Sequence, residues 1–127
     1  MTNGFLRTRD KRLDFGKVNL ASGLTSGAAT FPDVIGIDEG DVNQFNVGFE
    51  FETAPAGGTA ITFSIEGSAD NSTYVEIGSA TGSLTGPTFI AIPRGTTYKY
   101  LRAKVKASTG TFTAGVVSAG IDVYVGK

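Results

Sequence analysis

Short segments of alternating apolar and polar side chains, separated by turn-forming residues, run through most of this sequence. The clearest is NQFNVGFEFET, in which Phe45, Val47, Phe49 and Phe51 alternate with polar residues or glycine. A repeat of two residues predicts a β-strand that turns one face to a core. Seven further segments of this kind lie at residues 17–20, 33–37, 59–67, 74–79, 86–93, 96–108 and 111–125.

About eight strands in a chain of 127 residues with 18 glycines favour an all-β protein. We expect a single-domain, jelly-roll-like antiparallel β-sandwich over residues 17–127, preceded by an extended basic N-terminal arm over residues 1–16. An immunoglobulin-like sandwich or a small barrel fits the pattern almost as well. The residues expected to be buried between two sheets are Phe45, Phe49, Phe51, Ile61, Phe63, Ile65, Leu101 and Val105.

Turns are predicted where glycine, proline and small polar residues gather: PAGG at 55–58, SADNST at 68–73, RGTT at 94–97 and STG at 108–110. The Ala-Gly steps at 114–115 and 119–120 indicate a bulge or a bend, because glycine removes the Cβ obstacle. The segment GPTFIAIP is apolar on both faces, which predicts a strand that is covered on both sides.

Cysteine and histidine are both absent. The chain therefore lacks the commonest general base, the thiol nucleophile and the usual zinc or copper ligands, and we expect neither enzyme activity nor a cofactor. Charged residues stand near the N-terminus where a signal peptide needs an apolar stretch, and no apolar run approaches the roughly 18 residues of a membrane span. These features predict a soluble protein from a reducing compartment with no membrane partner.

A net charge of −1 hides an uneven distribution of charge along the chain. Residues 1–17 carry five cations and two carboxylates, residues 18–93 carry nine carboxylates and no cation, and residues 94–127 carry six cations and one carboxylate. A basic arm, an acidic middle and a basic end favour oriented docking onto charged neighbours over general affinity for nucleic acid.

The segment TTYKYLRAKVKAS, residues 96–108, separates two sets of side chains when it is read as a strand. Leu101, Ala103 and Val105 form a core face, and the opposite face is a Tyr/Arg/Lys stripe. This stripe could stack bases and neutralise phosphates, form a solvated strand face, or belong to a protein interface. Its members are Tyr98, Tyr100, Arg102, Lys104 and Lys106.

Two acidic features allow a catalytic or metal-binding interpretation, and neither is preferred. DEGD at residues 38–41 could bind a cation, but its spacing differs from the EF-hand loop, and acidic turns are common on protein surfaces. Glu50 and Glu52 share one strand face at a separation of roughly 7 Å, as two glycosidase carboxylates could. Exposed alternating Glu is far commoner, and the chain has no Trp to stack a sugar. We therefore predict no metal site and no catalytic residue.

Residues 92–125, IPRGTTYKYLRAKVKASTGTFTAGVVSAGIDVYV, resemble the end of the cement (decoration) proteins that coat the heads of Bordetella-phage-type tailed bacteriophages. The shared features are PRG before an aromatic-rich strand, YLR within that strand, and TG-x-F-TAG-xx-SAG-I at the close. DKRLDF, VIGIDEG and SADNSTYVEI continue the resemblance more weakly, in the same order along the chain.

The resemblance implies a jelly roll that binds the outer surface of an icosahedral capsid and cements neighbouring major capsid protein subunits. It also implies a homo-oligomer, with a dimer favoured over a trimer, in the virion and, during assembly, in the host cytoplasm. We expect the stripe and the arm to contact the capsid or a sister subunit, and no nucleic acid to be bound. The alternative is a sandwich module that binds carbohydrate or single-stranded nucleic acid. The arm residues expected to make these contacts are Phe5, Leu6, Arg7, Arg9 and Arg12.

Overall fold

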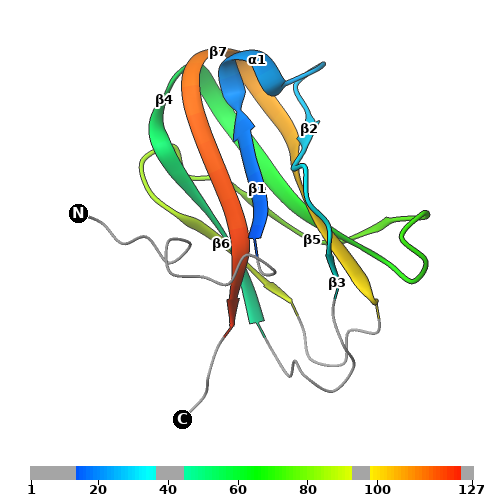
Figure 1. Ribbon diagram of the computed structural model, residues 1–127. Coiled ribbons are helices and arrows are strands. Elements are labelled where there is room, and N and C mark those ends of the chain that lie inside the picture. Colours follow the sequence, from blue (N-terminus) through cyan, green and yellow to red (C-terminus); the bar gives the residue numbers. More distant parts are fainter. Residues whose placement is uncertain (1–13, 37–44, 93–97, 124–127) are drawn as a thin grey trace.

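The computed structural model describes residues 14–36, 45–92 and 98–123, and almost all of its regular structure is antiparallel β (Figure 1). The predicted all-β class is confirmed. The elements of this described part are β1 (Asp14–Asn19), α1 (Leu20–Gly23), β2 (Ala29–Thr30), β3 (Ile35–Gly36), β4 (Phe45–Ser68), β5 (Val75–Thr81), β6 (Thr88–Ile92) and β7 (Tyr100–Val123).

Two strands of 24 residues, β4 and β7, organise the fold. They pair from Phe45 opposite Val123 to Ser68 opposite Tyr100, and both bend over the same end of the molecule (Figure 1). The first half of β4 pairs with β6, and the second half of β7 pairs with β1. We name these four paired segments the β6 layer. The second half of β4 pairs with β5, and the first half of β7 pairs with β2 and β3. We name these paired segments the β5 layer. The paired strands thus fold over into a sandwich of two layers.

Aromatic stacking between the layers marks the core. The rings of Phe49, from the β6 layer, and Phe63, from the β5 layer, stack with centroids 4.3 Å apart. Phe31 meets Phe49 edge-on at 5.8 Å. Of the expected core residues, Phe51 is only partly buried, and the side chain of Phe45 lies outside the described residues. The remainder are buried as predicted: Phe49, Ile61, Phe63, Ile65, Leu101 and Val105.

The turns predicted at residues 55–58 and 108–110 are wrong, because both segments are bends inside continuous strands. Ala56 pairs with Ala114 and Gly58 with Gly110, with register shifts on either side. The backbone has φ of +96° at Gly57, +85° at Gly110 and +135° at Gly115. Glycine allows such bulges without a steric cost, so each strand crosses from one layer to the other without reversing.

Strand β6 is not covered on both sides, contrary to the prediction from its apolar sequence. Its side chains alternate between buried and exposed, and Phe89 is 46% exposed. The strand pairs with β4, and its outward residues lie on the surface of the β6 layer. Apolar composition alone therefore gave the wrong burial for this face.

The first strand starts at Asp14, which lies inside the predicted arm of residues 1–16. Phe15 is fully buried in the core, so the sandwich includes residues before the predicted boundary at 17. A register shift lies between Asp14 and Gly16, where β1 pairs with Gly120 and Ala119. This irregularity interrupts the alternation of β1 and explains why periodicity did not reveal the start of the strand. In the described part of the chain, every helix is too short or too polar to cross a membrane.

Candidate interaction surface

The outer face of the β5 layer carries three cations of the Tyr/Arg/Lys stripe. Leu101, Ala103 and Val105 are fully buried beneath them, as the alternation predicts. On the other side of β7, Arg102 and Lys104 are half-buried and Lys106 is exposed, so this part of the stripe has the expected orientation. Tyr100 is half-buried at the start of the same strand.

Glu66 of β4 neutralises much of this positive charge. It lies directly opposite Arg102 in the strand register, and the Arg102 Nε to Glu66 Oε1 distance is 2.6 Å. Its second oxygen, Oε2, lies 3.7 Å from Nζ of Lys104. The Glu66 side chain is only 13% exposed, so water screens these contacts less than it screens a pair on the open surface. The Glu66 carboxylate thus forms ion pairs with both Arg102 and Lys104.

The same network extends to β5 and to the residue before it. Lys106 Nζ lies 3.1 Å from Glu76 Oε1, with side chains 47% and 39% exposed. The guanidinium carbon of Arg102 lies 4.0 Å from the centre of the Tyr74 ring, within the range of a cation–π contact. Burial raises the pKa of Tyr74, although the positive charge of Arg102 acts in the opposite direction. The face therefore presents three cations, two carboxylates and two tyrosines that are already organised by one another.

Tyr98 does not belong to this outer face, and the prediction is wrong at this residue. A Cβ placed on Gly67 would lie 2.7 Å from Cγ of Tyr98. Gly67 pairs with the buried Leu101, so this Cβ direction leads to the core side of the layer. Strand β7 starts only at Tyr100, so strand alternation does not extend to Tyr98.

Removing the central carboxylate tests how much the network contributes. We expect Glu66→Gln to lower the free energy of unfolding by about 1–2 kcal/mol at low salt, because two part-buried cations lose their charged partner. The matched change Glu76→Gln removes an exposed pair and should cost less than about 1 kcal/mol. Urea unfolding of both variants gives the comparison. Equal losses would show that the burial of Glu66 adds nothing to its contribution.

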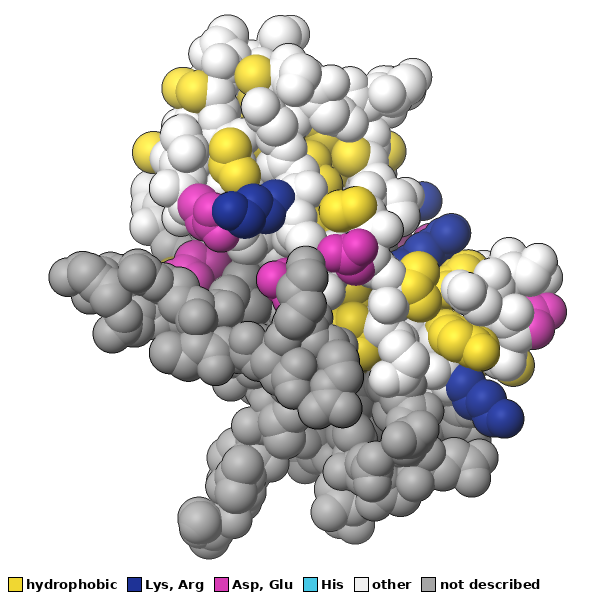
Figure 2. All heavy atoms as spheres, in the orientation of Figure 1, with side chains coloured by type: hydrophobic (Ala, Val, Ile, Leu, Met, Phe, Trp, Pro, Cys, Tyr) yellow, Lys and Arg dark blue, Asp and Glu magenta, His cyan; other side chains and the backbone are white. Residues whose placement is uncertain are grey.

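A second ionic cluster lies on the outer face of the β6 layer. Lys17 Nζ lies 2.8 Å from Glu52 Oε1, and the hydroxyl of Ser118 donates to Glu52 Oε2. The hydrogen bond with Glu52 and its negative charge raise the pKa of Lys17. Glu52 is thus part of an ion pair, which favours a structural over a catalytic role for it. Figure 2, in the orientation of Figure 1, shows few other charged side chains on the upper part of the front face, where hydrophobic groups are scattered.

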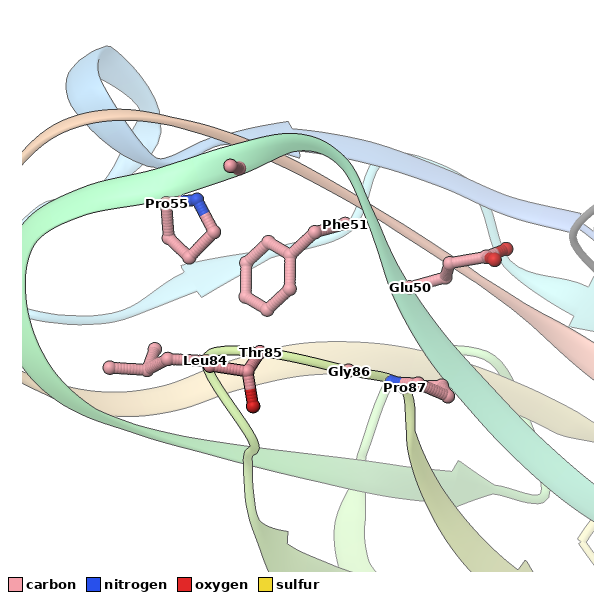
Figure 3. A pocket seen from close by; sticks show the side chains of 8 residues that line it. Glu50, Phe51, Pro55, Leu84, Thr85, Gly86 and Pro87 are labelled. Atoms are coloured by element: carbon pink, nitrogen blue, oxygen red, sulfur yellow. The ribbon is translucent and has the colours of Figure 1, made fainter. Parts of the chain in front are cut away.

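A groove of about 470 Å³ opens beside the bend of β4, and the sequence gave no indication of it (Figure 3). Phe51, expected in the core, forms part of its wall, which explains its partial exposure. The groove brings together the β4 bend and the loop between β5 and β6, about thirty residues apart in sequence. Its lining residues are Glu50, Phe51, Ala54, Pro55, Leu84, Thr85, Gly86 and Pro87.

The predicted arm contacts Phe5, Leu6, Arg7, Arg9 and Arg12 lie outside the described residues, as does the acidic segment 38–41. Within the described ranges, no three His, Cys, Asp or Glu side chains are grouped so that they could hold a metal ion. No protein-family model matches the sequence, and a search of curated proteins likewise gives no match.

Proposed function

We propose that this protein is a non-enzymatic cement protein of a tailed bacteriophage, bound to the outer surface of the capsid. The observation that carries the proposal is the resemblance of residues 92–125 to that family. The motif coincides with β7, and its glycines Gly110 and Gly115 have positive φ where β7 crosses between the layers. The similar residues are thus ones that dictate the sandwich, which supports a shared architecture.

The outer face of the β5 layer supports a protein partner over a nucleic acid. Tyrosine and arginine are enriched in protein interfaces, and here Tyr74, Tyr100 and Arg102 are grouped on one face. Binding to phosphates depends on cations that are free to replace counterions. Arg102, Lys104 and Lys106 already have carboxylate partners within the chain.

Cementing by such a protein works by mass action. A protein that binds only the assembled shell lowers the free energy of the shell relative to that of the dissociated capsid subunits. Exposed ion pairs contribute only about 0–1 kcal/mol each, so firm attachment requires apolar contacts and several linked sites. In this proposal the protein is a homo-oligomer, with a dimer favoured over a trimer, that bridges neighbouring major capsid protein subunits. The proposed contacts are Phe5, Leu6, Arg7, Arg9 and Arg12 of the arm together with the four stripe residues on the outer face, Tyr100, Arg102, Lys104 and Lys106.

Two exposed lysines, one on each outer face, allow a matched test of capsid docking. Lys106 and Lys17 each form a surface ion pair with a glutamate, on the β5 and β6 layers respectively. We expect Lys106→Glu to weaken binding to undecorated capsids about tenfold, by repulsion as well as lost attraction, and Lys17→Glu to leave it nearly unchanged. Sedimentation of capsids with labelled protein measures both. Equal effects would contradict docking through the β5 layer.

Salt dependence separates the cement function from the alternative binding module. Higher salt should slow association with capsids, because the screening length falls from about 10 Å at 0.1 M to about 3 Å at 1 M. Capsids that are already decorated should keep the protein, because salt does not weaken apolar burial. Binding to labelled oligonucleotides that collapses with rising salt, without any capsid binding, would overturn the proposal in favour of a nucleic-acid module. Binding to glycans alone would favour a carbohydrate module.

A further inference from the structure

The groove beside the β4 bend combines a largely apolar lining with one carboxylate, that of Glu50. The Phe51 ring lies between Pro55 above and the Leu84–Thr85 loop below, and it packs against the core (Figure 3). An apolar group placed there would extend the core across the edge of the sandwich. Glu50 stands at one end of the groove, directed away from the Phe51 ring (Figure 3).

Within the part of the chain that the structure describes, Glu50 differs from Glu52 in having no ion-pair partner. Lys17 pairs with Glu52, whereas Glu50 forms no ion pair with any residue in the described ranges. A carboxylate at the end of an apolar groove favours a ligand that carries a positive charge beside its apolar group.

The loop that forms the far wall is already organised for binding. Oγ of Ser83 accepts hydrogen bonds from the backbone N–H groups of Thr85, at 3.2 Å, and Gly86, at 3.1 Å. The Ser83 N–H donates to Oγ1 of Thr88 at 2.9 Å. A preformed wall reduces the entropy that a ligand must lose on binding.

The chain itself contains a segment with the matching chemistry. Residues 18–93 include no Lys or Arg, so a cation for Glu50 must come from one of the basic ends or from another molecule. Phe5-Leu6-Arg7 places two apolar residues directly before a cation. Neighbouring side chains of an extended peptide point in opposite directions, so a peptide with Leu6 in the groove would direct Arg7 out of it, free to pair with Glu50.

The direction of β1 favours the groove of a neighbouring molecule. Asp14 pairs with Gly120, and Asn19 pairs with Val116, which lies opposite Thr53 beside the groove. Strand β1 therefore runs towards the groove, so its first residue, Asp14, lies at the end of the strand that is farther from the groove. The thirteen residues before Asp14 can span at most about 45 Å when extended, enough to reach a second molecule.

We propose that the groove binds Leu6 and Arg7 of a second copy of this chain, with Leu6 beside Phe51 and Arg7 paired with Glu50. Two copies related by a two-fold axis would exchange N-terminal segments and form both contacts at once. The paired contacts then act as linked sites, so neither needs to be strong alone. The inference does not depend on capsid binding.

Because the chain has no cysteine, engineered disulfides can test this exchange in the full-length protein. A Thr8→Cys chain mixed with a Thr85→Cys chain should form a covalent dimer under mild oxidation, seen on non-reducing gels. Thr30→Cys is the matched control, because it replaces an exposed threonine on β2, outside the groove. We expect the control to cross-link at least about tenfold more slowly, because docking does not hold the thiol at position 8 close to a thiol at position 30 and so does not raise their effective concentration.

The outcomes of the mixing experiment separate the two possible docking modes. Equal rates for Thr85→Cys and the control, or no cross-link, would overturn the exchange. A chain with both Thr8→Cys and Thr85→Cys that closes only on itself would also overturn it, in favour of docking within one molecule. None of these results involves the capsid, so they cannot be confused with failure of the cement function.

A charge swap gives an independent test of the Arg7–Glu50 contact. Glu50→Arg and Arg7→Glu should each raise the dissociation constant of the full-length dimer about two- to fivefold, as for an exposed ion pair. The two changes in one chain should restore the affinity, because the pair is re-formed with its signs exchanged. Analytical ultracentrifugation measures all three. Loss of affinity in the doubly changed chain, equal to the two single losses together, would overturn the pairing.

Discussion

Phe63→Ala should lower the free energy of unfolding by about 3–5 kcal/mol, as truncation of a large buried aromatic does. Phe63 is fully buried, and its ring stacks on Phe49 of the other layer, so the change leaves a cavity at the contact between the two layers. Neighbouring side chains can fill this cavity only in part, because strands fix both sides of it. Urea or thermal unfolding provides the measurement.

Phe89→Ala is the matched control for the loss of a phenyl ring. Phe89 lies on the outer face of β6 and is 46% exposed, so the change removes much less buried surface and should cost about 1 kcal/mol. If Phe63→Ala unfolds with an undiminished transition, or costs no more than Phe89→Ala, the packing of the two layers described above is wrong.

Gly57→Ala should lower the free energy of unfolding by about 3 kcal/mol or more. The backbone at Gly57 has φ of +96°, which side chains rarely adopt. The added Cβ would overlap the carbonyl oxygen of Thr111 and lie 2.9 Å from the amide nitrogen of Thr113. Both neighbours are backbone atoms of β7, so the clash can be relieved only by moving a strand.

Gly86→Ala is the control for this change. A Cβ at Gly86 has open space, with its nearest neighbour 3.9 Å away, and its backbone φ is not in the positive range. We expect it to be neutral or to stabilise by up to about 1 kcal/mol, because alanine restricts the unfolded chain more than glycine does. Chemical denaturation of the two variants should therefore separate them clearly. Similar stabilities would show that β4 and β7 do not cross at Gly57.

Alternation in the sequence was sufficient to predict the local structure of the strands. Phe49, Phe63 and Leu101 are buried because a strand must turn every second residue to the same face. The same rule placed Arg102 and Lys104 on the outer face. Where alternation failed, an irregular backbone was the cause: a register shift in β1 follows Asp14, and Tyr98 precedes the first residue of β7.

The sequence alone also marked where the regular strands are interrupted, since the glycines of PAGG and STG stand at the two bends. It did not distinguish a reversal from a bend, because glycine permits both. Pairing decided the outcome: Ala56 lies opposite Ala114 and Gly58 opposite Gly110, so each segment continues as one strand of a pair that passes between the layers.

Only the tertiary structure determined the chemistry of the surfaces. Glu66 neutralises Arg102 across 36 residues, and the groove joins Phe51 and Pro55 to Leu84 and Pro87. The sequence determined which side chains point outward and where the strands are interrupted, because these depend on the local backbone repeat and on glycine. Which outward side chains become partners depends on the register between distant strands, and that register is set by burial of the whole core.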